Sequence, residues 1–233
     1  KIYREDGVAI HYYLEKASQG SDSETLLIAL QGSDCNSVKH SKFAQVQTKS
    51  IWPLADLLFV EKPGITASLP YSSDTERPDC PAYYIHKDSP TQRAQDVKSV
   101  VDHVLEGRRY RNIIAMGGSE GATVAAIFAA ESGIPDAVVL INGGGRWFLD
   151  DVLHSIRSTS SSNDLQSELN GFNGFAEHIL KSEPFHLEMS GHGYGWWRSM
   201  LTIDQQSVLN EIKAPVLVVQ GGRDESVSLE AVA

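Results

Sequence analysis

Five short apolar runs constrain the fold of this chain more than any other feature of its sequence. Each run is nearly continuous rather than alternating and is bounded by turn residues, which is typical of parallel strands buried on both faces. The runs are Leu26–Gln31, Leu57–Val60, Ile113–Met116, Ala137–Ile141 and Val216–Gln220. The earlier stretch Val8–Glu15 alternates apolar and polar residues and predicts a half-exposed edge strand.

Helical patterns separate these runs. Ser89 is a good N-cap and Pro90 suits the first helical position, and apolar residues follow at helical spacing. An Ala-rich helix is expected from about Ser119 to Glu131. Strands that alternate with helices predict an α/β fold with a mainly parallel sheet.

Residues 147–210 break the alternation, because they contain no convincing strand. Helical patterns occur near Leu165–Leu180 and Ser199–Ile212. We therefore expect a core of residues 1–146 and 211–233 with an inserted helical cap of residues 147–210. The many aromatic residues of this cap fit either ordinary helix packing or the roof of an apolar pocket.

Charge excludes one class of partner. The chain has 20 Lys and Arg against 30 Asp and Glu, a formal net charge of −10. A nucleic-acid binder needs a basic patch to neutralise phosphates, so we expect no nucleic-acid partner. No apolar run approaches the roughly 20 residues of a transmembrane helix, so no transmembrane segment is expected. The sequence does not indicate an oligomeric state.

The most specific chemical signal is the run from Gly117 to Gly121, which reads Gly-Gly-Ser-Glu-Gly. It follows a predicted strand and opens a predicted helix, the context that a G-x-S-x-G nucleophile elbow requires. A sharp strand-to-helix turn exposes Ser119 at the edge of the sheet, and glycines remove the Cβ atoms that would clash. The helix N-terminus favours developing negative charge.

With this motif the chain resembles the α/β-hydrolase family over nearly its whole length. Gln31-Gly32-Ser33 looks like the oxyanion loop, where the family often has His-Gly. The resemblance implies that the backbone N–H groups of Ser33 and Glu120 form the oxyanion hole. A backbone donor does not depend on the side chain of Gln31.

The same resemblance implies a triad acid after the last apolar run. Gly221-Gly222-Arg223-Asp224 follows that run, and Asp224 matches the acid, with Glu225 as the fallback. A carboxylate there holds the imidazole in its productive tautomer and stabilises its charged form.

The triad histidine is missing from its expected place. The family has it beyond the acid, yet no histidine follows Asp224 in this sequence. We expect the catalytic histidine, with the last strand of the core, to lie beyond Ala233. His192 in the cap is a weaker alternative, because it would violate the family order.

The two cysteines, Cys35 and Cys80, are compatible with two free thiols or one disulfide. In the resembling fold both follow neighbouring strands at the same edge, which favours the disulfide. A disulfide implies a periplasmic or secreted protein, with a cytoplasmic location as the alternative.

Taken together, these features predict a serine hydrolase that cleaves a carboxylic ester or thioester of a small-molecule acyl substrate through an acyl-enzyme. Ser119 is the expected nucleophile, and no metal or organic cofactor is expected. A prolyl-oligopeptidase-like peptidase is one alternative. The other is a non-catalytic binding protein that lacks the triad histidine.

Overall fold

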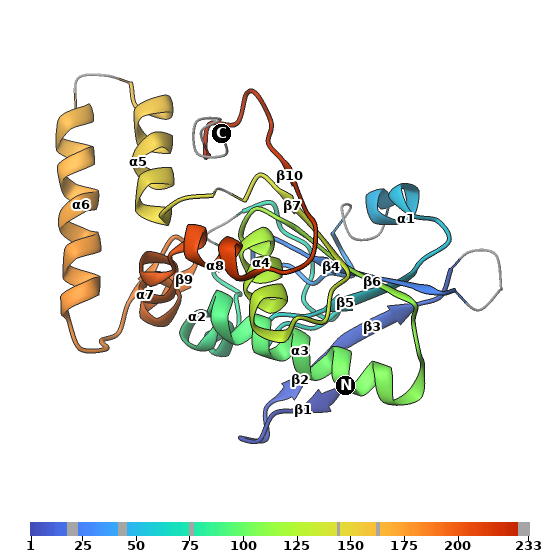
Figure 1. The fold of residues 1–233 in the computed structure, drawn as a ribbon. Helices are drawn as coiled ribbons and strands as arrows, with labels where there is room; N and C mark the ends of the chain where they lie inside the picture. The colour runs from blue at the N-terminus through green and yellow to red at the C-terminus, as the bar shows by residue number, and fades with distance from the viewer. Residues whose placement is uncertain (18–22, 42–45, 75–76, 144, 162–163, 228–233) are drawn as a thin grey trace.

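The molecule consists of a central sheet, helices on the faces of that sheet, and a group of helices at one end (Figure 1). The structure is a computed structural model. It describes residues 1–17, 23–41, 46–74, 77–143, 145–161 and 164–227. Residues 228–233 of the expected core segment therefore lie outside the described residues.

The six-stranded sheet has the order β10-β7-β6-β4-β5-β3 and is parallel except for β3. Its strands are β3 (Tyr12–Glu15), β4 (Thr25–Leu30), β5 (Asp56–Val60), β6 (Asn112–Gly118), β7 (Ala137–Ile141) and β10 (Val216–Val219). Each of the five apolar runs forms one parallel strand. The prediction of an α/β fold with a mainly parallel sheet is therefore confirmed.

The N-terminal stretch differs in detail from the single predicted strand. It divides at His11 into β2 (Ala9–Ile10) and β3, and β2 pairs with β1 (Ile2–Tyr3) in a separate two-stranded sheet. β3 pairs antiparallel with β5 at the edge of the main sheet and is half-buried, as the alternating pattern predicts.

Two faces of the sheet carry separate apolar clusters. Along β4, Leu26 and Ile28 face α3 (Pro90–Gly107) and α4 (Glu120–Ser132), while Leu27 faces the other way. The second face packs with Val38 from a loop that precedes α1 (Thr48–Ile51). The alternation follows from the two-residue period of a strand.

Both predicted core helices are confirmed. Ser89 caps α3 by accepting a hydrogen bond from the Gln92 N–H at 3.2 Å, and Pro90 is its first residue. α4 is apolar nearly all round and almost fully buried, because α3 and α8 (Gln205–Glu211) pack against it.

The prediction that the last apolar run is buried on both faces is wrong. β10 is an edge strand, and Leu217 and Val219 are exposed. The strand pairs on one side with β7 only, and its outer side has no partner strand among the described residues. A continuous apolar pattern is therefore compatible with a strand of which only one side is paired.

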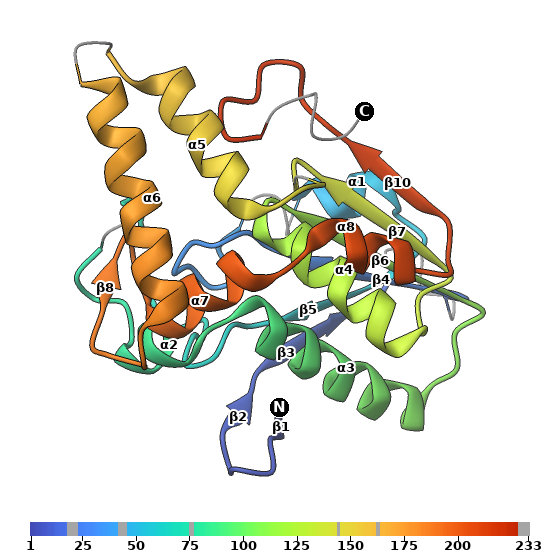
Figure 2. The same ribbon diagram turned by 60° about the vertical axis from the view of Figure 1, so that its left-hand side comes forward.

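Beyond β7 the chain forms α5 (Phe148–Thr159), α6 (Leu165–Lys181) and α7 (Tyr194–Thr202), which lie together at one end of the molecule (Figures 1 and 2). They bury Trp196 and Trp197 in an apolar cluster of their own. The helical pattern Ser199–Ile212 is two helices, α7 and α8, and α8 packs on α4.

A two-stranded hairpin, missed in the sequence, precedes α7. It consists of β8 (Glu188–Met189) and β9 (His192–Gly193) and packs near α2 (Ala82–Lys87). Strands of two residues leave no periodic signal.

Cys35 and Cys80 form a disulfide, with Cα atoms 6.0 Å apart, as predicted. Among the described residues no helix combines the length and apolar character needed to cross a bilayer.

Candidate active site

Ser119 lies at the turn between β6 and α4. Its backbone has φ 54° and ψ −130°, and Glu120 begins the helix immediately afterwards. A positive φ is unusual for a residue with a Cβ and costs energy, which the surrounding structure must overcome. The strained strand-to-helix turn is the geometry expected of a nucleophile elbow.

Two glycines allow this turn to form. A Cβ on Gly117 would lie 1.9 Å from the carbonyl oxygen of Gly121, inside the elbow itself. A Cβ on Gly121 would lie 2.2 Å from the carbonyl oxygen of Leu30, at the end of β4. No side chain fits at either position, so the predicted elbow glycines have a steric reason.

The loop after β4 lies directly beside the serine. A Cβ on Gly32 would be 3.3 Å from Ser119 Cβ and 3.6 Å from Ser119 Oγ. The N–H of Glu120, in the first turn of α4, has no acceptor within its own helix. The structure thus brings Ser119, Glu120 and the loop containing Ser33 to one place, and the helix dipole of α4 favours negative charge there.

The turn after β10 reaches the same edge of the sheet. Gly118 pairs with Ile141, and Ile141 pairs with Val219, so the three strands end in one row. Asp224 lies beyond that row and accepts hydrogen bonds from the N–H groups of Ser226, at 2.8 Å, and Val227, at 3.1 Å.

A pocket of about 240 Å³ connects these parts. It is lined by Ser119 and Glu120 of the elbow, by Phe148 and Asp151 of α5, and by Val227 beside Asp224, among others. The predicted nucleophile therefore lines this pocket together with residues of the helices that follow β7. The fallback acid Glu225 is exposed.

Among the described residues, no histidine lines the pocket that contains Ser119. All eight histidines lie in the described ranges, and within those ranges none forms a hydrogen bond to Ser119 or Asp224. His192 is buried and stacks on Trp196, with ring centroids 3.8 Å apart. Burial lowers the pKa of His192 to about 4, so the ring is neutral at pH 7.

Asp151 is a residue of the pocket that sequence reasoning missed. Its carboxylate is buried, with Oδ1 3.5 Å from Nε of Arg146. Burial raises the pKa of Asp151 to about 6. An acidic residue in the first turn of a helix is common, so the sequence contains no signal that sets this one apart.

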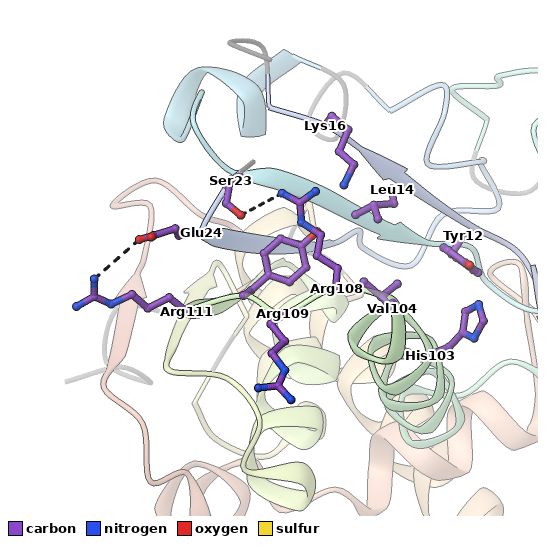
Figure 3. Close-up of a pocket in the computed structure, with 12 residues that line it drawn as sticks. Tyr12, Leu14, Lys16, Ser23, Glu24, His103, Val104, Arg108, Arg109 and Arg111 are labelled. Atoms are coloured by element: carbon purple, nitrogen blue, oxygen red, sulfur yellow. Dashed lines mark hydrogen bonds and ion pairs between the residues drawn. The ribbon is translucent and has the colours of Figure 1, made fainter. Parts of the chain in front are cut away.

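A larger hollow of about 990 Å³ lies at the opposite, amino-terminal edge of the sheet (Figure 3). Three of its cationic side chains, Lys16, Arg108 and Arg111, form ion pairs with acids. Nζ of Lys16 and Nη2 of Arg108 lie 3.1 and 3.4 Å from Oδ2 of Asp56. Nη1 of Arg111 lies 3.9 Å from Oε2 of Glu24. Figure 3 shows the three arginines of this hollow pointing in different directions, so they do not converge on one ligand.

Comparison with known proteins finds solved structures of similar fold. No protein-family model and no curated protein sequence matches the chain. Solved structures do match. Est1E from Butyrivibrio proteoclasticus is 18% identical with a TM-score of 0.62, and the match covers 99% of this chain and 80% of Est1E.

Two further solved structures also match most of this chain at low sequence identity. The esterase Pf2001 from Pyrococcus furiosus is 17% identical with a TM-score of 0.60, over 99% of this chain and 73% of its own. The enol-lactonase from Burkholderia xenovorans LB400 is 15% identical with a TM-score of 0.54, over 95% and 81%. From the sheet order, the elbow and these likenesses, we conclude that the chain has the α/β-hydrolase fold.

Proposed function

We propose that this protein is a serine hydrolase that cleaves a carboxylic ester, or a thioester, of a small-molecule substrate. The observation that carries the proposal is the strained Ser119 between β6 and α4, open to a pocket and flanked by the loop after β4. Esterases and a lactonase among the structures of similar fold support a hydrolase.

The proposed reaction proceeds through an acyl-enzyme. Ser119 Oγ attacks the substrate carbonyl carbon and gives its proton to a base. The N–H groups of Ser33 and Glu120 stabilise the oxyanion that forms. Collapse of this intermediate breaks the bond to the leaving oxygen or sulfur, which takes the proton from the base, and water then releases the acid by the same steps.

Asp224 is assigned to orient the imidazole that acts as the base. All eight histidines lie in the described ranges and none of them hydrogen-bonds Asp224 or Ser119, so we assign the role of base to none of them. Residues 147–210 are assigned to a helical cap over the pocket, and the assignment is supported by Phe148 and Met200, which line the pocket. The disulfide supports a periplasmic or secreted location.

A second candidate function follows from the same missing contact. A protein with this fold and no base beside the serine would bind a small molecule without cleaving it. Hydrolysis of short p-nitrophenyl esters and of aminoacyl p-nitroanilides by the full natural chain separates the two candidates. The esterase proposal expects turnover of the esters that is lost in Ser119→Ala. Binding without turnover in both proteins would favour the binding function, and preferential amide cleavage would favour a peptidase.

A further inference from the structure

The carboxylate of Glu120 joins three elements beneath the serine. Arg93 of α3 donates from Nη1 to Oε1 at 2.6 Å, and Trp196 of α7 donates from Nε1 to Oε2 at 2.8 Å. The Arg93 and Glu120 side chains are 5% and 2% exposed. Each oxygen of this buried carboxylate thus accepts from a different helix.

The same guanidinium also holds the loop on the other side of the serine. Nη2 of Arg93 donates to the carbonyl oxygen of Gln31 at 2.8 Å. One planar group therefore ties the first residue of α4 to the loop after β4. A guanidinium has two separate donors in a fixed fork, which a lysine ammonium does not reproduce.

A second buried side chain fixes the far end of that loop. Tyr84 donates from its hydroxyl to the carbonyl oxygen of Ser33 at 2.6 Å. The N–H of Ser33 belongs to the peptide group between Gly32 and Ser33. Arg93 binds the carbonyl oxygen of the preceding peptide group, and Tyr84 binds that of the following one. The peptide group that carries the Ser33 N–H is therefore held on both sides and has little freedom to rotate.

The charges of this cluster are consistent with a permanent ion pair. Burial alone would raise the pKa of Glu120, but the Arg93 guanidinium beside it keeps that pKa below its ordinary value. A buried ion pair of this kind contributes little to stability on balance, because desolvation opposes the attraction. Its hydrogen bonds do specify one geometry, which is the property that an oxyanion hole needs.

We propose that Arg93 is a positioning residue that fixes the two oxyanion-hole donors, the N–H groups of Ser33 and Glu120, relative to each other. The inference rests on the proposed function. Arg93 does not touch the substrate in this account and acts through Glu120 and Gln31. A misplacement of 1 Å at a reacting centre costs on the order of 100-fold in rate.

The test compares two arginine-to-lysine variants of the full natural chain. Arg93→Lys keeps the positive charge but removes the fork that joins Glu120 to Gln31. The control is Arg4→Lys, because Arg4 also forms a two-point ion pair with an acid of α3, Asp96, through Nε and Nη2. Among the described residues, the side-chain hydrogen bonds and ion pair of Arg4 involve neither the loop after β4 nor the elbow.

The inference expects kcat for a p-nitrophenyl ester to fall at least about tenfold in Arg93→Lys, with KM changed less than about threefold. In Arg4→Lys both constants should stay within about twofold of wild type. Equal kcat in wild type and a folded Arg93→Lys would overturn the inference. So would an equal loss in both variants, because the effect would then reflect general damage to α3.

Tyr84→Phe provides an independent variant should Arg93→Lys fail to fold, since it keeps the ring and removes only the donor to Ser33. A lower kcat at unchanged KM is expected, and an unchanged kcat would contradict the proposed control of the loop. Wild-type protein that shows no Ser119-dependent hydrolysis would refute the proposed function itself, and the inference with it.

Discussion

Removing the disulfide between Cys35 and Cys80 is expected to destabilise the fold mainly through the unfolded state. The cross-link closes a loop with a sequence separation of 45 residues. Loop-closure entropy for that length corresponds to about 4 kcal/mol at 25 °C. The two cysteines are 4% and 9% exposed, so losing their sulfur atoms also removes packing contacts.

Urea unfolding followed by tryptophan fluorescence measures this effect in three samples. They are oxidised wild type, reduced wild type and the double variant Cys35→Ala/Cys80→Ala. Reduced wild type keeps both sulfur atoms, so its difference from oxidised wild type isolates the loop-closure contribution. A free energy of unfolding that falls by less than about 1 kcal/mol on reduction would refute the reasoning, and a reductant effect on the double variant would show another cause.

Two further predictions concern the elbow and the pocket. Gly121→Ala should lower the free energy of unfolding by more than about 2 kcal/mol, because its Cβ would meet backbone at 2.2 Å. Gly118→Ala is the matched control in the same motif, since its Cβ would meet nothing within 4 Å, and similar thermal melts of both variants would contradict the steric argument. Asp151→Asn tests the raised pKa of about 6. A raised carboxyl pKa means that the native state binds the extra proton, so wild-type stability falls as pH rises from about 4 to 6. The free energy of unfolding of Asp151→Asn, relative to that of wild type, should therefore increase as the pH rises from about 4.5 to about 7.5 in urea titrations. A difference that increases as the pH falls would contradict the raised pKa of Asp151.

The strands and the elbow were predictable because their signals are local. Continuous apolar runs predicted the five parallel strands, and a five-residue motif between a strand and a helix predicted the elbow. Ser89 likewise caps a helix that begins at the next residue. Each of these signals lies within one short stretch of the sequence.

The features that the sequence did not reveal depend on distant partners. The contact between Arg93 and Glu120 spans 27 residues, and that between Glu120 and Trp196 spans 76. No pattern marks these residues as partners. The exposure of β10 was missed for the same reason, because an apolar strand does not show in its own sequence whether a second neighbour covers it.

Covalent labelling of the serine tests the central claim most directly. The full natural chain is treated with a fluorophosphonate probe, and the modified peptide is identified by mass spectrometry, with Ser119→Ala as the control. The account predicts one modified residue, Ser119, at the strained turn between β6 and α4, and no labelling of the variant. Labelling that persists unchanged in Ser119→Ala, or a wild-type chain that does not react, would contradict the assignment of Ser119 as the nucleophile.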